Sequence, residues 1–98
     1  MKLRILSLAA RDASEARRWY SEQNPALGDR FETALGDTFA HLLEHPRAFP
    51  IVRRDIRRAP VGDAFSVYQI YYRLEETDLV VVAVVHSARH PRHWQRRR

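Results

Sequence analysis

Two long segments in the first half of the chain carry apolar residues at helical spacing. Residues 9–22 form the first, with Ser7 as its expected cap and a stripe made of Ala9, Ala13, Ala16 and Tyr20. Asn24 and Pro25 predict that one helix ends and another begins there, because Asn caps helices well and Pro fits the first helical position. The second stripe runs as far as Pro46 and consists of Leu27, Phe31, Ala34, Leu35, Thr38 and Leu42, widened by Phe39 and Leu43. So short a connection predicts an antiparallel helical hairpin.

Shorter segments before and after this hairpin predict strands. Residues 2–6 alternate between two faces, and residues 51–60 have the pattern of a basic strand or ribbon. In residues 65–74 one face is expected to hold Tyr68, Ile70, Tyr72 and Leu74, and the other Val67, Gln69, Tyr71 and Arg73. Residues 79–85 are all apolar, as expected for a central strand.

The order of these elements predicts the fold class. It is an α+β fold, with an N-terminal strand and a two-helix antiparallel hairpin packed on a small, mainly antiparallel β-sheet. The sheet face away from the helices should stay partly open to a partner. At 98 residues the chain is expected to form a single domain, residues 1–98.

Composition excludes several classes of protein. The chain contains no cysteine, which rules out a disulfide framework and a thiolate metal site and fits a cytoplasmic location. Its amino end lacks a charged segment followed by an apolar run and a cleavage site, and no apolar stretch has membrane-spanning length. We therefore expect a protein that is not exported and has no membrane partner.

The positive charge is concentrated in the second half of the chain. Residues 1–45 carry six Lys or Arg against seven Asp or Glu, a net charge of −1, whereas residues 46–98 carry eleven against five, a net charge of +6. All but one of the cations are Arg, which pairs bidentately with carboxylate or phosphate. A face of this kind attracts phosphate backbones or an acidic protein. The alternative is a solvated basic surface with no partner.

Several short pieces of the chain, taken in order, resemble a known family. In the first half they are Ala9, Asp12, Trp19, Tyr20 and the run Asn24-Pro25-Ala26-Leu27-Gly28-Asp29-Arg30-Phe31. In the second half they are His45-Pro46, Ile56-Arg57-Arg58, Ile70-Tyr71-Tyr72-Arg73, His86-Ser87-Ala88-Arg89, Pro91 and Trp94. Together they resemble the ParE/RelE superfamily, the toxins of type II toxin–antitoxin systems.

The resemblance implies a compact toxin of the RelE/ParE-like fold, neutralised by a cognate antitoxin in a hetero-oligomeric complex. ParE relatives block DNA gyrase, whereas RelE relatives cut messenger RNA in the ribosome without a metal. The chain has Ser66-Val67 where many relatives have Phe-Pro, so the entry to that strand is expected to differ. The lysine-rich strands and late tyrosine of many of the nucleases are missing, with Trp94 near the end instead. This favours the ParE-like branch and inhibition of gyrase, with the ribosome-dependent endoribonuclease as the alternative.

Candidate target-binding residues lie in the basic second half and are Arg57, Arg58, Tyr71, Arg73, His86, Arg89 and Trp94. His86 and Arg89 follow the central strand, where a side chain can leave the core for a cleft. Each has a structural alternative: His86 bonding a neighbouring backbone group, and Arg89 pairing with Glu75, Glu76 or Asp78.

A metal-free nuclease would need a base, an acid and cations against the phosphate. If the chain is an enzyme, the catalytic set is His86, Arg73 and Arg89, with Glu75, His90 and His93 as further proton carriers and Arg57 as a further clamp. The three late histidines sit on no predicted helix and have no carboxylate among them, so neither a metal nor another cofactor is expected.

The aromatic residues divide between the core and the surface. Trp19 and Tyr20 are expected in the core between the helices. Tyr71, opposite in face to Tyr72, is expected to be exposed beside Arg73 as a contact residue. Trp94 either stacks on a partner or closes the bottom of the core.

Overall fold

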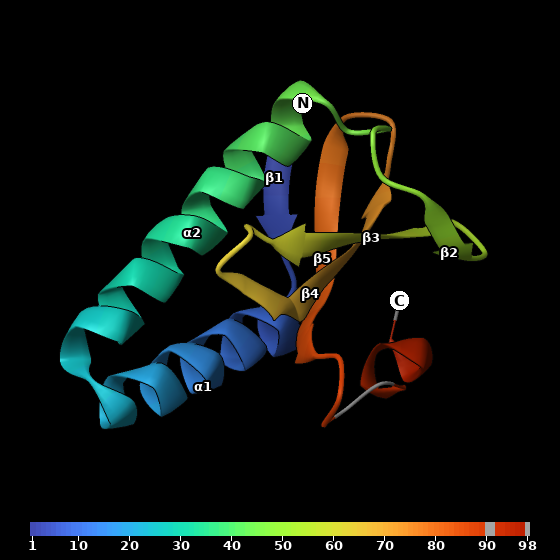
Figure 1. The fold of residues 1–98 in the computed structure, drawn as a ribbon. Helices are drawn as coiled ribbons and strands as arrows, with labels where there is room; N and C mark the ends of the chain where they lie inside the picture. Colours follow the sequence, from blue (N-terminus) through green and yellow to red (C-terminus); the bar gives the residue numbers. More distant parts are fainter. Residues whose placement is uncertain (90–91, 98) are drawn as a thin grey trace.

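The helices and the sheet form two layers. The computed structural model describes residues 1–89 and 92–97, with these elements: β1 (Lys2–Ile5), α1 (Ser7–Gln23), α2 (Pro25–Glu44), β2 (Ile51–Arg53), β3 (Ile56–Val61), β4 (Phe65–Leu74), β5 (Asp78–His86) and the 3-10 helix η1 (His93–Arg96). The sheet has the strand order β1-β5-β4-β3-β2. Only β1, which is parallel to β5, departs from antiparallel pairing in this sheet. Figure 1 shows both long helices on one side of the sheet and η1 on the other, so the predicted α+β fold is confirmed.

The connection between the helices forms as the sequence predicts. The Asn24 side chain accepts a hydrogen bond from the Ala26 N–H at 3.0 Å, and Pro25 occupies the first turn of α2.

The prediction that Ser7 caps α1 is wrong: the cap position is Leu6, without a capping side chain. Leu6 still donates its N–H to the Val81 carbonyl of β5, at 3.1 Å, and its own carbonyl already accepts from helix α1. Strand pairing therefore runs directly into the helix.

No helix in the described part of the chain is long and apolar enough to cross a membrane.

The main core lies between the hairpin and the sheet. The α2 stripe and the predicted inner face of β4 meet there, and its largest fully buried side chains include Phe31, Leu42, Ile70 and Tyr72. Tyr20, Phe31, Phe65 and Tyr68 pack with ring centroids 5.0–5.9 Å apart. This confirms the division of β4 into two faces and fixes Tyr68 under α1.

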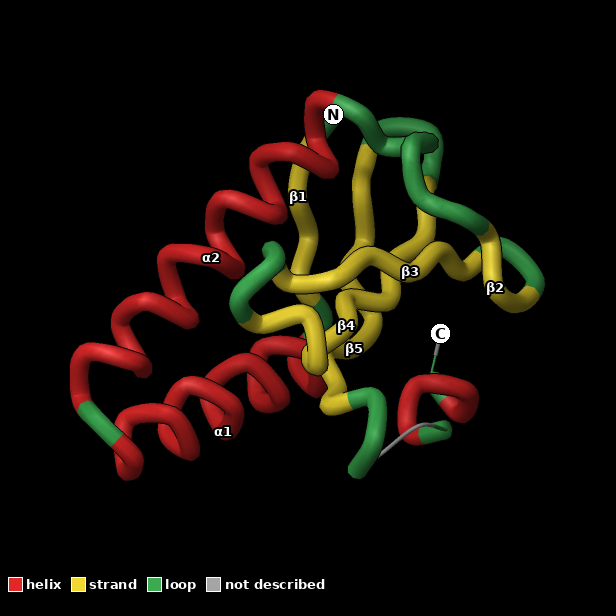
Figure 2. The backbone as a smooth tube through the Cα atoms, in the orientation of Figure 1, coloured by secondary structure: helices red, strands yellow, loops and turns green. Residues whose placement is uncertain are grey.

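The basic segment 51–60 forms two strands rather than one. Residues 54–55 make a turn between β2 and β3, and Arg54 has a φ of +52°. The prediction of a single strand or ribbon missed this reversal, because no glycine marks it and a left-handed arginine is uncommon. Figure 2 shows the turn as the loop at the free tip of the β2–β3 hairpin.

The second face of the sheet is more covered than expected. A smaller apolar cluster lies there, made of Ile56, Tyr71, Val82, Ala83, Val85 and Trp94. Trp94 comes from η1, which lies against β5 because the chain turns back after that strand (Figure 1). The expectation of a partly open face holds only outside this cluster, where Val67 and Arg58 remain exposed.

Two glycines of α2 differ sharply in their surroundings. A Cβ added at Gly28 would lie 1.8 Å from Ser21 Oγ and 3.0 Å from Ser21 Cβ, whereas one added at Gly36 would meet nothing within 4 Å. The helices can therefore approach closely only because residue 28 has no side chain.

We expect Gly28→Ala and Gly36→Ala to change stability in opposite directions. Gly28→Ala should lower the free energy of unfolding by about 1–3 kcal/mol through overpacking. Gly36→Ala should raise it by up to about 1 kcal/mol through helix propensity. Urea denaturation of both variants measures the difference, and Ser21→Ala should recover part of the Gly28→Ala loss. Equal effects of the two alanines would show that the close approach at Gly28 is unimportant.

Candidate functional site

A cleft opens where α1 crosses the end of β5. We call it the α1–β5 cleft; it has a volume of about 360 Å³ and an apolar wall of Ala16, Val84 and Val85. Three rings, those of Trp19, Tyr68 and His86, line it as well. The charged residues of its lining are Asp12, Glu15, Arg18 and Arg89. Asp12, Ala16 and Trp19 share one side of α1, since residues three or four apart on a helix are neighbours.

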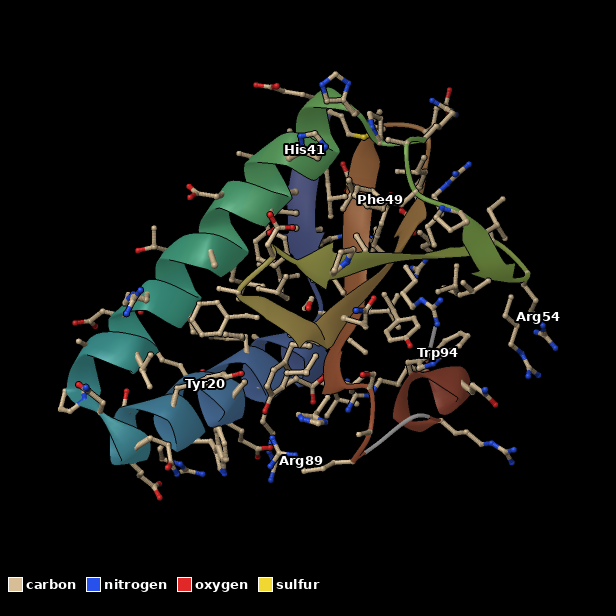
Figure 3. The ribbon with its side chains drawn as sticks, viewed as in Figure 1. Tyr20, His41, Phe49, Arg54, Arg89 and Trp94 are labelled. Atoms are coloured by element: carbon tan, nitrogen blue, oxygen red, sulfur yellow. The ribbon has the colours of Figure 1, made fainter. Side chains whose placement is uncertain are left out.

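Arg89 is held at the mouth of this cleft by two aromatic residues. Its guanidinium lies 5.0 Å from the centroid of the Trp19 ring and 5.9 Å from that of Tyr68, and it donates a 2.7 Å hydrogen bond to the Tyr68 hydroxyl. The side chain is nevertheless exposed. Figure 3 shows Arg89 beside α1, far from Arg54 at the tip of the β2–β3 hairpin. The cation is thus positioned without being buried.

The Tyr68 hydroxyl is neutral in this arrangement. Burial raises the pKa of Tyr68, and Arg89 offsets part of the rise. The hydroxyl therefore keeps its proton at neutral pH while its oxygen accepts from Arg89. Tyr68 was expected on the core face of its strand, and its ring does lie there.

His86 shapes the turn that carries Arg89. Its Nδ1 accepts hydrogen bonds from the backbone N–H groups of Ala88 and Arg89, both at 3.2 Å. The imidazole lies edge-on to Tyr68, with centroids 5.3 Å apart. The expectation that His86 bonds a neighbouring backbone group is confirmed. The expectation that Arg89 pairs with an acidic residue of the β4–β5 turn is wrong, because that turn lies at the other end of β5.

Asp12, which lines the cleft, forms a nearly buried ion pair with Arg97. The Asp12 carboxylate accepts from Arg97 at 2.5 and 3.2 Å and from the Val84 N–H at 3.1 Å. Arg97 also donates to the Val82 carbonyl at 3.4 Å. The two side chains are only 11% and 12% exposed.

The position of this pair follows from the pairing of the strands. Bonding between β1 and β5 ends at Leu6 and Val81, so the later backbone groups of β5 have no strand on that side. The register with β4 shifts between Tyr71 and Tyr72, which leaves Val82 as an extra residue in β5. Such a bulge re-aims the groups that follow it. Asp12 and Arg97 then take the place of the missing strand.

The comparison with known families identifies the chain. Residues 3–91 match the model of a family described as the ParE toxin of the type II toxin–antitoxin system, parDE. The chain belongs to the ParE toxin family. It is therefore the toxin of a toxin–antitoxin system, and that system implies an antitoxin partner. No curated protein matches this ParE-family toxin.

The remaining predicted site residues of the toxin lie away from the cleft. Arg57 donates to the backbone carbonyls of Arg47 and Phe49, at 3.3 and 2.7 Å, and so holds the segment after α2. Arg73 forms an ion pair with Glu75 at 2.9 Å. Arg58 is exposed on the second sheet face, opposite Tyr71 in register.

The expectation that Tyr71 is exposed is wrong. Its side chain is 3% exposed and stacks on Trp94, with centroids 4.4 Å apart and an interplanar angle of 12°. Trp94 itself is 6% exposed, so of its two predicted roles the structure bears out closure of a core. Figure 3 shows Trp94 on the η1 side of the sheet, opposite Tyr20 on the helical side. The returning C-terminal segment covers a face that the strand pattern alone leaves open.

The structure does not bring the nuclease set together. Arg73 is paired in register with Val80, near the start of β5, whereas His86 ends that strand. Six residue steps along β5 separate the two positions by roughly 20 Å. Arg89 lies with His86 at the far end. His90 falls outside the described residues, as does the side chain of His93.

Sequence reasoning missed three residues of the site. Trp19 was expected in the core, but it is 43% exposed and packs on Tyr20 and Arg89 at the rim of the cleft. Asp12 and Arg97 were assigned no role. The signal for Asp12 was available: it lies on the alanine-rich side of the helix, and a carboxylate facing the core requires a partner. No local pattern points to Arg97.

Proposed function

We propose that this ParE-family toxin inhibits DNA gyrase, acts in the cytoplasm and is held inactive in a hetero-oligomeric complex with its antitoxin. The observation that carries the proposal is the match to the ParE toxin family over residues 3–91. The dispersal of the nuclease set supports it, since a catalyst needs its groups within reach of one substrate.

The alternative, a ribosome-dependent endoribonuclease, is disfavoured by the state of its proton carriers. A general base needs a free lone pair, and Nδ1 of His86 already accepts from two backbone amides. Glu75 is bound by Arg4 at 2.8 Å and by Arg73 at 2.9 Å. Neither group is placed to exchange protons with a ribose and a leaving oxygen at one site.

We place the target contact at the α1–β5 cleft. Arg89 presents its charge there, and His86 fixes the turn that carries it. Arg58 extends the basic surface on the second sheet face. Arg57, Arg73, Tyr71 and Trp94, also candidates from the sequence, act by holding the fold that supports this surface.

We place the antitoxin on the helical hairpin and the neighbouring β1 edge of the sheet. β1 is an edge strand, and exposed strand edges in a small domain are ready to pair with an extended segment. Three large apolar side chains are exposed near it: Met1, Ile5 and Leu8. An amphipathic antitoxin segment would cover them.

Purified toxin should inhibit supercoiling by DNA gyrase, because the proposed target contact requires no chemistry by the toxin. The same preparation added to translating ribosomes should produce no new cuts in messenger RNA. Supercoiling assays and primer extension measure the two outcomes, and toxin mixed with its antitoxin is the control that should restore supercoiling. Codon-specific cleavage with unaffected gyrase would refute the proposal in favour of the nuclease.

A further inference from the structure

We infer that the α1–β5 cleft is a receptor for a single acidic side chain flanked by apolar residues in a protein partner. Arg89 is the group that binds the carboxylate, and Trp19 and Tyr68 are positioning residues for it. The inference rests on the proposed function only for the identity of that partner, a gyrase subunit.

The guanidinium of Arg89 is positioned to bind a planar anion. A guanidinium has five N–H donors, and the one hydrogen bond that its side chain makes to a described residue goes to Tyr68. Its other donors make no hydrogen bond to the described residues and can therefore serve a ligand. The Trp19 ring lies 5.0 Å from the cation and limits its movement, so less side-chain entropy is lost on binding.

The acidic residues that line the cleft already have partners. Asp12 accepts from Arg97 and Val84, and Glu15 lies 3.2 Å from Arg11 in an ion pair. The positive groups at the mouth, Arg18 and Arg89, are therefore not neutralised by the lining. They attract one incoming negative group.

The lining of the cleft also argues against a nucleic acid. Proteins that bind a strand line its path with cations and stacking rings, because each nucleotide adds a phosphate. Here the lining formed by the described residues offers two arginines, Arg18 and Arg89, and no path of cations for a series of phosphates. The exposed Trp19 ring, which lies beside the largely buried Ala16, Val84 and Val85 of the lining, instead suits an aliphatic side chain next to one carboxylate. These features favour a peptide.

Nuclear magnetic resonance titration of the full chain tests the receptor. The probes are an acetylated and amidated peptide Ala-Leu-Glu-Leu-Ala, its counterpart with Gln in place of Glu, and hexathymidylate. We expect the Glu peptide to shift the Trp19 indole N–H and Arg89 Nε–H signals, and the Gln peptide to bind at least about tenfold more weakly, because it lacks the charge-assisted hydrogen bonds.

Three variants assign the effect to the cleft. Arg89→Gln should reduce affinity for the Glu peptide by at least about tenfold, and Trp19→Leu should reduce it severalfold while leaving the charge in place. Arg30→Gln is the matched control: it removes the charge of another exposed arginine, on α2, and should bind like the parent. The amide spectrum of each variant shows whether it is folded.

Several results would overturn the receptor: tighter binding of hexathymidylate than of the Glu peptide, unchanged affinity in Arg89→Gln, or no shift at millimolar peptide. Inhibition of gyrase without peptide binding would keep the proposed function and overturn the receptor. Peptide binding without inhibition of gyrase would support the receptor and overturn gyrase as the partner.

Discussion

Asp12→Ala should lower the free energy of unfolding by about 2–3 kcal/mol, which for a domain of this size is a fall in melting temperature of roughly 10–20 °C. The change removes the carboxylate that accepts from both the Arg97 guanidinium and the Val84 N–H, in a site that is nearly buried. The loss stays below that of a fully buried pair, because both side chains keep some contact with water, with 11% and 12% of their surface exposed. Thermal and urea denaturation measure it.

Glu15→Ala is the matched control for this prediction. Glu15 lies one turn further along α1 and pairs with Arg11, but both side chains are more than half exposed. Exposed pairs contribute at most about 1 kcal/mol, so its effect should be small. Arg97→Ala should lower the free energy of unfolding less than Asp12→Ala does, since Asp12 keeps its hydrogen bond from the Val84 N–H. If Asp12→Ala matched Glu15→Ala, the pair would not hold the C-terminal segment to the sheet.

Elements set by neighbours in sequence were predictable. Asn24 and Pro25 act within one turn of helix, and their effect does not depend on the sheet. The alternation in β4 separates Tyr72 from Tyr71 because successive side chains of a strand point to opposite faces. The prediction that Ser7 caps α1 was wrong because the start of that helix depends on where β1 stops pairing, and β5 determines that point.

The candidate site depends on contacts between distant segments and was predicted only in part. His86 and Arg89 were found because they follow a long apolar strand that fixes their position. Asp12 and Arg97 are 85 positions apart in the sequence. They come together beside a bulge in β5 that no residue type in the sequence indicates. Tyr71 is buried by Trp94 for a similar reason. A strand pattern says which residues share a face, but it does not say what covers that face.

Arg89→Ala should abolish growth arrest while the folded state stays within about 1 kcal/mol of the parent, as expected for an exposed side chain. The variant loses one hydrogen bond to Tyr68 and the ring contacts with Trp19 and Tyr68. No buried group among the described residues is left without a partner, because the Tyr68 hydroxyl borders the open cleft. Growth curves with and without induction, at equal toxin levels by immunoblot, measure toxicity. Thermal denaturation measures stability.

Arg89→Lys separates charge from geometry. Lysine keeps the positive charge but has no planar fork and stacks less well on Trp19, so it should restore only a small part of the toxicity. Arg30→Ala is the control, since it removes an exposed arginine on the other side of the hairpin, and it should remain fully toxic. Full toxicity of Arg89→Ala would move the target contact to Arg58 and the second sheet face. Loss of toxicity in Arg89→Ala and its retention in Arg89→Lys would mean that the target senses a charge at the cleft mouth rather than a positioned guanidinium.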